Sequence, residues 1–191
     1  MTVQTDTDTC TAPASVNNGS YDPDGDPIII EQSPIGPYAL GTTDVDLTVA
    51  DDKGLSNTCT TTVTVVDQTT PEISLTVSPD IFWPPNHKMV AISPTVTAID
   101  NCDLAPAIRL KSITMNEGEE ANTYDPNHDS NTGDGNTTGD IKIDSDGNIF
   151  LRAERSGYGS GRVYTITYTA TDSAGNVATA SVTVNVPHDM K

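Results

Sequence analysis

One pattern of alternating residues occurs twice in the chain and limits what it can fold into. Residues 45–50 alternate in polarity. They are followed by the turn sequence Asp51-x-x-Gly54 and then by a second alternating run that ends at Val65. The same order recurs from Ile166 through Asp172-x-x-Gly175 to residue 184. Alternating runs that flank a glycine-containing turn predict a β-hairpin. We therefore predict an all-β protein of two tandem antiparallel β-sandwich domains.

The domain boundary is predicted at a short joint, residues 67–71, which ends in Pro71 and should act as a stiff spacer. The first domain is predicted to span residues 1–68 and to begin with a polar arm, residues 1–9, that has no evident partner. The second is predicted to span 69–191. It carries a polar insertion at 116–139, and loops of such length are usually functional or disordered.

Strands are predicted wherever residues of alternating polarity lie between turn residues. A tight hairpin is predicted around Asp146 and Gly147, because short apolar runs flank this pair. The predicted strands are 14–16, 28–32, 43–49, 60–66, 72–77, 89–92, 95–99, 108–115, 141–143, 149–154, 163–170 and 178–186.

The chain is strongly acidic, with a formal net charge of −18 and 21 Asp beside 6 Glu. This charge argues against nucleic acid and anionic membranes as partners, because phosphate groups are bound by Lys and Arg. The sequence also has no apolar run long enough to cross a membrane. Asp is common in turns and in metal-binding loops. An alternative interpretation of the many acidic residues is that they only keep the surface soluble, as in halophilic proteins.

The three cysteines predict an oxidising compartment. Cys10 opens the first domain and Cys59 lies on its last strand, so we predict a disulfide between them and a free Cys102. Three reduced thiols in an intracellular protein are the alternative. No secretory signal is visible at Met1, so we expect a mature fragment of a secreted or surface-exposed protein.

Calcium is the predicted cofactor, because hard cations take six to eight oxygen ligands from acidic loops. In the first domain, Asp22, Asp24 and Asp26 alternate around Gly25, although a plain turn explains the same residues. In the second domain, loops at one end of a sandwich converge and could share one ion, to which Asp67 at the joint could contribute. Unrelated solvated turns are the alternative. The predicted ligands there are Asp100, Asn101, Asp103, Asp134, Asn136, Asp140 and Asp172.

The only tryptophan, Trp83, precedes two prolines. An aromatic platform for sugar, with Tyr124 or Tyr158, is one interpretation. We favour the other, in which Trp83 is buried and closes one end of the sandwich. No catalytic constellation is evident, since the histidines lack metal-ligand spacing and Ser160 lacks the nucleophile-elbow pattern.

The quoted patterns resemble a known family. The first domain resembles the hyalin repeat (HYR). The residues that carry this resemblance are Gly41-Thr42-Thr43, the alternating run to Asp51, Gly54, Cys59 and residues 63–67. Residues 20–26 are similar to polycystic-kidney-disease (PKD) and bacterial Ig-like modules, and 100–102 and 169–176 extend the likeness into the second domain. The resemblance implies Ig-like sandwiches in extracellular, often repetitive bacterial proteins that adhere or space other domains. Ala180 replaces the cysteine that stands at position 59 in the first copy.

These observations together predict an extracellular, calcium-stabilised structural or adhesive module that is not an enzyme. Its predicted partners are other copies of itself or neighbouring Ig-like modules joined end to end, as in a stalk or filament, with the N-terminal arm as a donated strand. An accessory carbohydrate-binding module that contacts polysaccharide is the alternative. An enzyme is the third and weakest reading.

Overall fold

The computed structural model describes residues 1–117, 123–124, 139–157 and 160–189, although not the side chains of 123 and 124. The described residues form strands and no helix, and hence no helix that could cross a membrane. Contacts divide the chain into two compact units. The N-terminal unit comprises Met1–Thr69 and Asn101–Leu104, and the C-terminal unit comprises Thr70–Asp100 and Ala105–Lys191.

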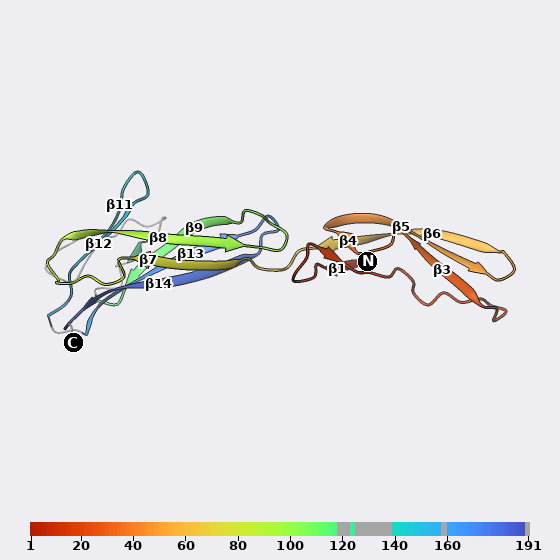
Figure 1. Cartoon of the computed structure of the whole chain (residues 1–191), viewed down its shortest axis with the longest axis horizontal. Coiled ribbons are helices and arrows are strands. Elements are labelled where there is room, and N and C mark those ends of the chain that lie inside the picture. Colours follow the sequence, from red (N-terminus) through yellow and green to blue (C-terminus); the bar gives the residue numbers. More distant parts are fainter. Residues whose placement is uncertain (118–122, 125–138, 158–159, 190–191) are drawn as a thin grey trace. The chain divides into compact units, whose positions relative to one another are not determined.

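The N-terminal unit is built on one long hairpin (Figure 1). β5 (Gly41–Asp51) pairs with β6 (Ser56–Val66), and β1 (Thr2–Gln4) and β3 (Ile28–Ser33) flank them in the order β1-β6-β5-β3. The second layer is short, because β2 (Thr11–Ala12) and β4 (Tyr38–Ala39) contain two residues each. The core of this unit is correspondingly small and consists of Ala12, Tyr38, Val45, Val63 and Val65.

The N-terminal arm does have a partner in its own unit, contrary to prediction. β1 runs parallel to the end of β6, with Thr2 opposite Thr64 and Gln4 opposite Val66. The backbone N–H of Thr5 continues this pairing by donating to the Val66 carbonyl at 3.0 Å. Its main-chain groups are thus used internally, so the arm is not a spare strand.

The predicted disulfide is also wrong. Cys10 is bonded to Cys102, with a Cα–Cα distance of 4.8 Å, and Cys59 is a free, exposed thiol. Cys59 lies opposite Leu47 in the middle of the hairpin, whereas the chain from β1 to Cys10 starts beside Val66. Seven residues of strand separate Cys59 from Val66, or roughly 23 Å. A disulfide needs Cα atoms within about 7 Å, so position along the sequence was a poor guide.

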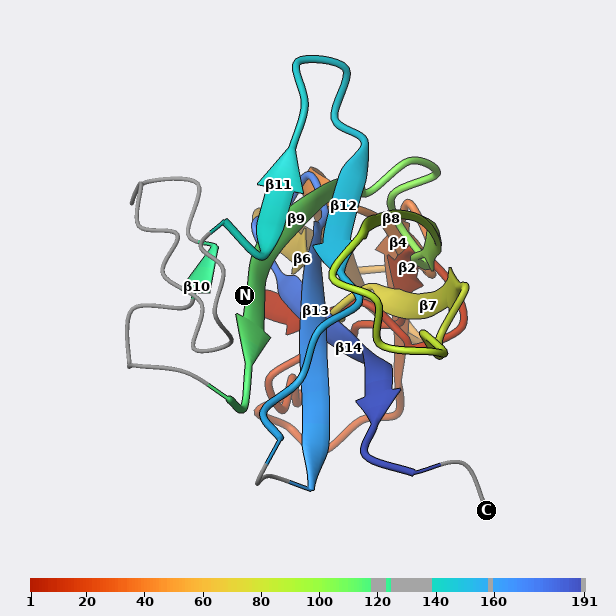
Figure 2. The ribbon, with the colours of Figure 1, turned by 90° about the vertical axis from the view of Figure 1, so that its left-hand side faces the viewer.

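The C-terminal unit is a two-sheet sandwich (Figure 2). One sheet has the order β10-β9-β13-β14, from β9 (Ala107–Met115), β10 (Thr123–Tyr124), β13 (Gly161–Thr171) and β14 (Val177–Pro187). The other has the order β11-β12-β8-β7, from β7 (Glu72–Ser78), β8 (Met89–Ile99), β11 (Ile141–Ile143) and β12 (Ile149–Arg152). The fold prediction is thereby confirmed: the protein is all-β and Ig-like.

Both sheets of the C-terminal unit contribute to its core. The largest buried apolar side chains include Ile113 and Ile166 on one sheet and Leu151 on the other. Among the described residues, the main buried core cluster is Phe82, Ile92, Ile113, Ile141, Ile149, Leu151, Ala153, Tyr164, Ile166, Val184 and Val186. Strand alternation directs these residues inward, because successive side chains point to opposite faces of a sheet.

β8 is one strand where the sequence predicted two. Its first part, Met89 to Ile92, pairs with β12, and its second part, Ser93 to Ile99, pairs with β7. Pro94 lies where the partner changes and faces Val77 of β7 alone. A proline removes a ladder donor and is tolerated where one side of a strand is unpaired. The strand therefore continues through the proline.

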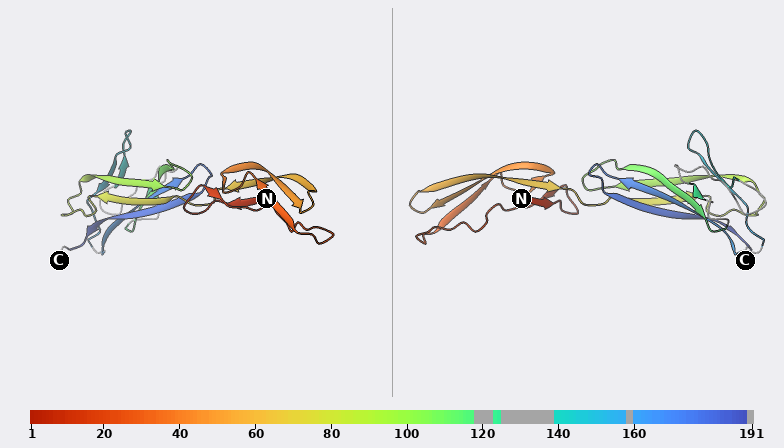
Figure 3. Two further views of the ribbon diagram at one scale, coloured as in Figure 1. Left: turned by 45° about the vertical axis from the view of Figure 1, so that its right-hand side comes forward. Right: turned by 180° about the vertical axis from the view of Figure 1, so that it is seen from behind.

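Three hairpins, β5–β6, β11–β12 and β13–β14, close with one and the same turn. Their strands can be followed by colour in Figure 3. An aspartate begins each turn, at Asp51, Asp144 or Asp172, and its Oδ1 accepts the backbone N–H four residues later at 2.7–2.9 Å. A glycine three residues after the aspartate has a φ between +82° and +94° in all three turns. Glycine adopts this left-handed conformation without strain. The Asp-x-x-Gly sequence therefore specifies these turns locally.

Candidate functional site

Two carboxylates gather at one end of the C-terminal unit. Asp100 directly follows β8 in one sheet, and Asp172 directly follows β13 in the other. Each offers a carboxylate oxygen, and these oxygens lie within 4.8 Å of each other. Asp172 is buried and Asp100 is half-buried. Two anionic groups this close, partly shielded from water, repel each other unless a cation compensates them.

The hairpin turn holds Asp172 in its ionised form. Burial raises the pKa of Asp172. Hydrogen bonds lower it, and they come from the Asn176 side chain and from the backbones of Asn176, Gly175 and Ala174. The net pKa of Asp172 is below its ordinary value. Asn176 donates its backbone N–H to Oδ1 and its side-chain amide to Oδ2, both at 2.8 Å. These bonds keep the Asp172 carboxylate anionic, and the anionic form is the one that ligates a cation.

The donor set and spacing fit a calcium ion. Calcium–oxygen distances are about 2.3–2.6 Å, so two ligands on opposite sides of one ion are separated by about 5 Å. The oxygens of Asp100 and Asp172 fall within this span. Carboxylates are also the hard oxygen ligands that this cation prefers. The pair can thus supply two ligands of a shell that needs at least four more.

The other ligands predicted for this site have contacts of their own. Asp67 is buried, and its Oδ1 accepts the Thr69 backbone N–H at 2.9 Å. The Asn101 side-chain amide donates to the Asp6 and Thr9 carbonyls at 3.0 and 3.3 Å, while its Oδ1 is buried without a hydrogen-bond partner among the described residues. Asp103 is half-buried. Asp134 and Asn136 lie outside the described residues.

The prediction that Asp140 joins Asp172 is wrong. Asp140 is almost fully buried and binds two arginines, with 2.8 Å to Arg152 Nε and 2.7 Å to Arg162 Nη1. Arg162 lies near the start of β13 and Asp172 follows its end, so about ten residues of strand, or roughly 33 Å, separate them. The two aspartates therefore lie at opposite ends of the sandwich.

Asp22, Asp24 and Asp26 form a turn of their own. The Oδ1 of Asp22 accepts the Asp24 backbone N–H at 2.8 Å and the Asp26 N–H at 3.4 Å, and Asp26 forms an ion pair with Lys53. These are the interactions of a plain aspartate turn. Among the described residues, the three carboxylates do not form a group spaced for a shared ion.

Trp83 does not occupy the buried position that was predicted for it. Phe82, not Trp83, enters the core of the C-terminal unit, and 46% of the Trp83 surface remains exposed. The interpretation of Trp83 as a buried plug is therefore wrong, because its neighbour in the sequence fills that position. The Tyr124 side chain and Tyr158 lie outside the described parts of the structure. The proposed platform for sugar at Trp83 stays a prediction.

The sequence reasoning missed a buried cluster of charges in the C-terminal unit. Arg162 is fully buried, contacts Asp140 and lies 3.8 Å from Glu117, and Glu154 is buried beside His87 at 3.4 Å. Burial raises the pKa of the core residue Tyr164 to about 12, although the adjacent Arg162 lowers it in part. No spacing in the sequence marks these residues, because only the packing of several segments buries them.

Comparison with known proteins supports the fold. Residues 103–185, less than half of the chain, match the family described as bacterial Ig domain. No curated protein matches the chain. The family match agrees with the Ig-like sandwich of the C-terminal unit.

Solved structures of extracellular cadherin domains are similar in part. PcdhgB3 EC1–4 is 14% identical over 79% of this chain and 33% of that chain, with a TM-score of 0.35. Domains 3–6 of protocadherin gamma B2 are 12% identical over 97% and 45%, with a TM-score of 0.37. Mouse protocadherin-24 EC1–3 is 13% identical over 83% and 57%, with a TM-score of 0.34. The chain thus spans a third to just over half of these chains.

Proposed function

We propose that the chain is an extracellular, calcium-stabilised structural or adhesive module of two Ig-like domains, 1–68 and 69–191, related to the HYR and PKD modules. Bacterial Ig domains are typically structural rather than enzymatic, which supports a structural role. The oxidised Cys10–Cys102 pair supports an extracellular location, because disulfides persist in oxidising compartments.

The observation that carries the calcium proposal is the pairing of Asp100 with Asp172 at the ends of β8 and β13. Asn101 directly follows Asp100, and its buried Oδ1 has no hydrogen-bond partner among the described residues. Asn101 and Asp67 stay predicted ligands. An ion at this end would join the two sheets of the C-terminal unit, since β8 and β13 belong to different sheets. Calcium would then act as a structural clamp.

The test is thermal unfolding followed by the fluorescence of Trp83, which lies in the C-terminal unit. At free calcium about 100-fold above Kd, binding adds about 2.7 kcal/mol, so chelation should lower the melting temperature. Asp172→Asn should abolish this response. Asp144→Asn is the matched control, because Asp144 occupies the same turn but is not grouped with Asp100. An identical melting curve in excess chelator would exclude the calcium clamp.

For assembly, we propose contact with neighbouring Ig-like modules end to end. Two Ig-like units already follow one another in this chain, and open sheet edges allow further pairing. β3 is an edge strand of its sheet among the described residues. Sedimentation and electron microscopy of the purified chain in millimolar calcium would test this proposal. Monomers at every concentration would make the chain a spacer within its parent protein and not a self-assembling subunit.

A further inference from the structure

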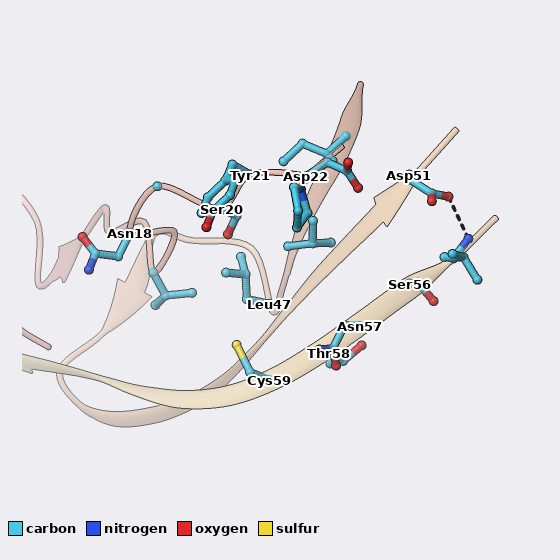
Figure 4. A pocket seen from close by; sticks show the side chains of 16 residues that line it. Asn18, Ser20, Tyr21, Asp22, Leu47, Asp51, Ser56, Asn57, Thr58 and Cys59 are labelled. Atoms are coloured by element: carbon cyan, nitrogen blue, oxygen red, sulfur yellow. Dashed lines mark hydrogen bonds between the residues drawn. The ribbon is translucent and has the colours of Figure 1, made fainter. Parts of the chain in front are cut away.

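The N-terminal unit contains a groove of about 670 Å³ that none of the predicted sites includes (Figure 4). One wall is the loop of residues 16–23, and the other is the distal half of the β5–β6 hairpin, with Leu47 and Cys59 on the floor. Ligand pockets in proteins usually have volumes of about 300–1,000 Å³. The groove is therefore large enough for several sugar rings or a short peptide.

The groove exists because the second layer of this unit is short. β2 and β4 cover the part of β5–β6 that carries Val45, Val63 and Val65, and their few residues end there. Beyond that point, no strand among the described residues covers the inner face of the hairpin. Only the loop passes over Leu47 and Val49. The groove is thus a consequence of the fold and does not depend on one rotamer.

Its polar side chains are available to a ligand. Asn18, Ser20 and Asn57 line the groove, and their side chains form no hydrogen bond with any described residue. Tyr21 lies on the rim with 79% of its surface exposed. An exposed tyrosine presents an apolar ring face and a hydroxyl group together. This combination suits a ligand that is rich in hydroxyl groups and has apolar C–H faces.

The charges of the groove restrict the ligand further. Asp22 and Asp51 are its only charged side chains, and no Lys or Arg lines it. In each aspartate, Oδ1 accepts backbone N–H groups of its own turn, which leaves Oδ2 to accept from a ligand. Carboxylates repel phosphate, sulfate and uronic acid groups but accept hydrogen bonds from hydroxyl groups. The groove therefore disfavours anionic partners and suits a partner that donates hydrogen bonds.

We propose that this groove binds a neutral oligosaccharide, with one ring stacked on Tyr21 and its hydroxyl groups bonded to Asn18, Asn57, Asp22 and Asp51. The inference is independent of the calcium clamp, which uses residues of the C-terminal unit. The groove would give the module a ligand for adhesion, and it is a different site from the predicted sugar platform at Trp83.

Cys59 supplies a built-in reporter for the experiment. It is the free thiol of the chain, it lines the groove, and the Cys10–Cys102 disulfide does not react with thiol reagents. The rate at which a thiol-reactive dye modifies Cys59 is measured on the full chain. The probes are hexasaccharides of glucose, mannose, galactose and N-acetylglucosamine, with a sulfated hexasaccharide as the charged control.

We expect at least one neutral hexasaccharide to slow modification of Cys59 about five-fold or more at saturation. Tyr21→Ala should remove this protection while leaving the unfolding temperature unchanged, because Tyr21 is an exposed side chain. Trp83→Ala should retain the protection. The proposal is overturned if no neutral hexasaccharide protects Cys59, if protection survives Tyr21→Ala, or if the sulfated probe protects better.

Discussion

The two units build the same kind of sandwich from very different cores. The N-terminal unit buries five core residues, of which Tyr38 is the largest, and a disulfide supplements them. The main core cluster of the C-terminal unit contains eleven of the described residues, and the unit also encloses Arg162, Asp140 and Glu154. Small domains bury too little apolar surface to be stable without additional constraints such as disulfides. The larger core can instead tolerate charged groups, provided that they are paired.

This difference indicates where each unit is vulnerable. In the N-terminal unit, stability depends on a covalent bond and on turns that fix a long hairpin. In the C-terminal unit, it depends on complete pairing of buried charges, because an unpaired buried charge is costly while a paired one is nearly neutral. Changes to one set of interactions should therefore leave the other unit intact, and four substitutions test this separation.

The largest effect is expected from Arg162→Met. The substitution removes Arg162 from Asp140, which keeps its contact with Arg152, and it removes a basic neighbour of Glu117. Breaking a buried pair in this way costs about 3–5 kcal/mol. The transition followed by Trp83 fluorescence should move to much lower temperature, while the N-terminal unit unfolds as before in calorimetry. Arg109→Ala, at an exposed position, is the control. Equal stability of both variants would show that the buried charges are replaceable.

Loss of the disulfide should come next. Cys102→Ser opens a loop with a sequence separation of 92. Loss of a disulfide typically costs about 2–4 kcal/mol, and the loop-entropy estimate for a loop of this length is about 4.6 kcal/mol. Calorimetry should show a lower transition for the N-terminal unit, with the Trp83 signal nearly unchanged. Cys59→Ser should have little effect, since this thiol is free and exposed. A shift of the Trp83 transition by a similar amount would refute the separation of the two units.

Alkaline pH should weaken the C-terminal unit. Burial raises the pKa of Tyr164 to about 12, against about 10 in an unfolded chain. Because the folded pKa is the higher one, this contribution is fully present below pH 10 and is lost as pH rises from 10 to 12. The loss amounts to about 2–3 kcal/mol, at about 1.4 kcal/mol for each pKa unit.

Denaturant titrations at several pH values, followed by Trp83 fluorescence, measure this loss. Tyr164→Phe should flatten the decline between pH 10 and 12, although it also removes the hydrogen bond to the Arg152 carbonyl at 2.9 Å. Tyr21→Phe is the control, because Tyr21 is an exposed tyrosine of the N-terminal unit. A decline of unchanged steepness in Tyr164→Phe would mean that another group is responsible.

The smallest effect concerns the hairpin of the N-terminal unit. Asp51→Ala removes two hydrogen bonds, to the backbone N–H groups of Lys53 and Leu55 at 2.9 and 2.7 Å, and should cost about 1 kcal/mol. Asp52→Ala, one residue further in the same turn, should stay within about 0.5 kcal/mol. If the two variants unfold at the same temperature, the aspartate at the first turn position is not what stabilises this hairpin.

The sequence was sufficient for the long strands and the hairpin turns, which depend on neighbouring residues. Alternation predicted the long strands, and Asp-x-x-Gly predicted the turns at Asp51 and Asp172, because backbone geometry and short-range hydrogen bonds act within a few residues. The prediction that loops at one end of the sandwich converge agrees with the approach of Asp100 to Asp172. Each of these two residues directly follows a strand, and that position was visible in the sequence.

Only the tertiary structure decided which distant residues meet. It paired Cys10 with Cys102, turned Asp140 toward two arginines at the far end of β13, and placed Phe82 where Trp83 was expected. It also left open the groove beneath Tyr21. Such contacts depend on strand length, on register and on how completely one layer covers another. These quantities are set by the packing of the whole unit, so no local pattern of residues encodes them.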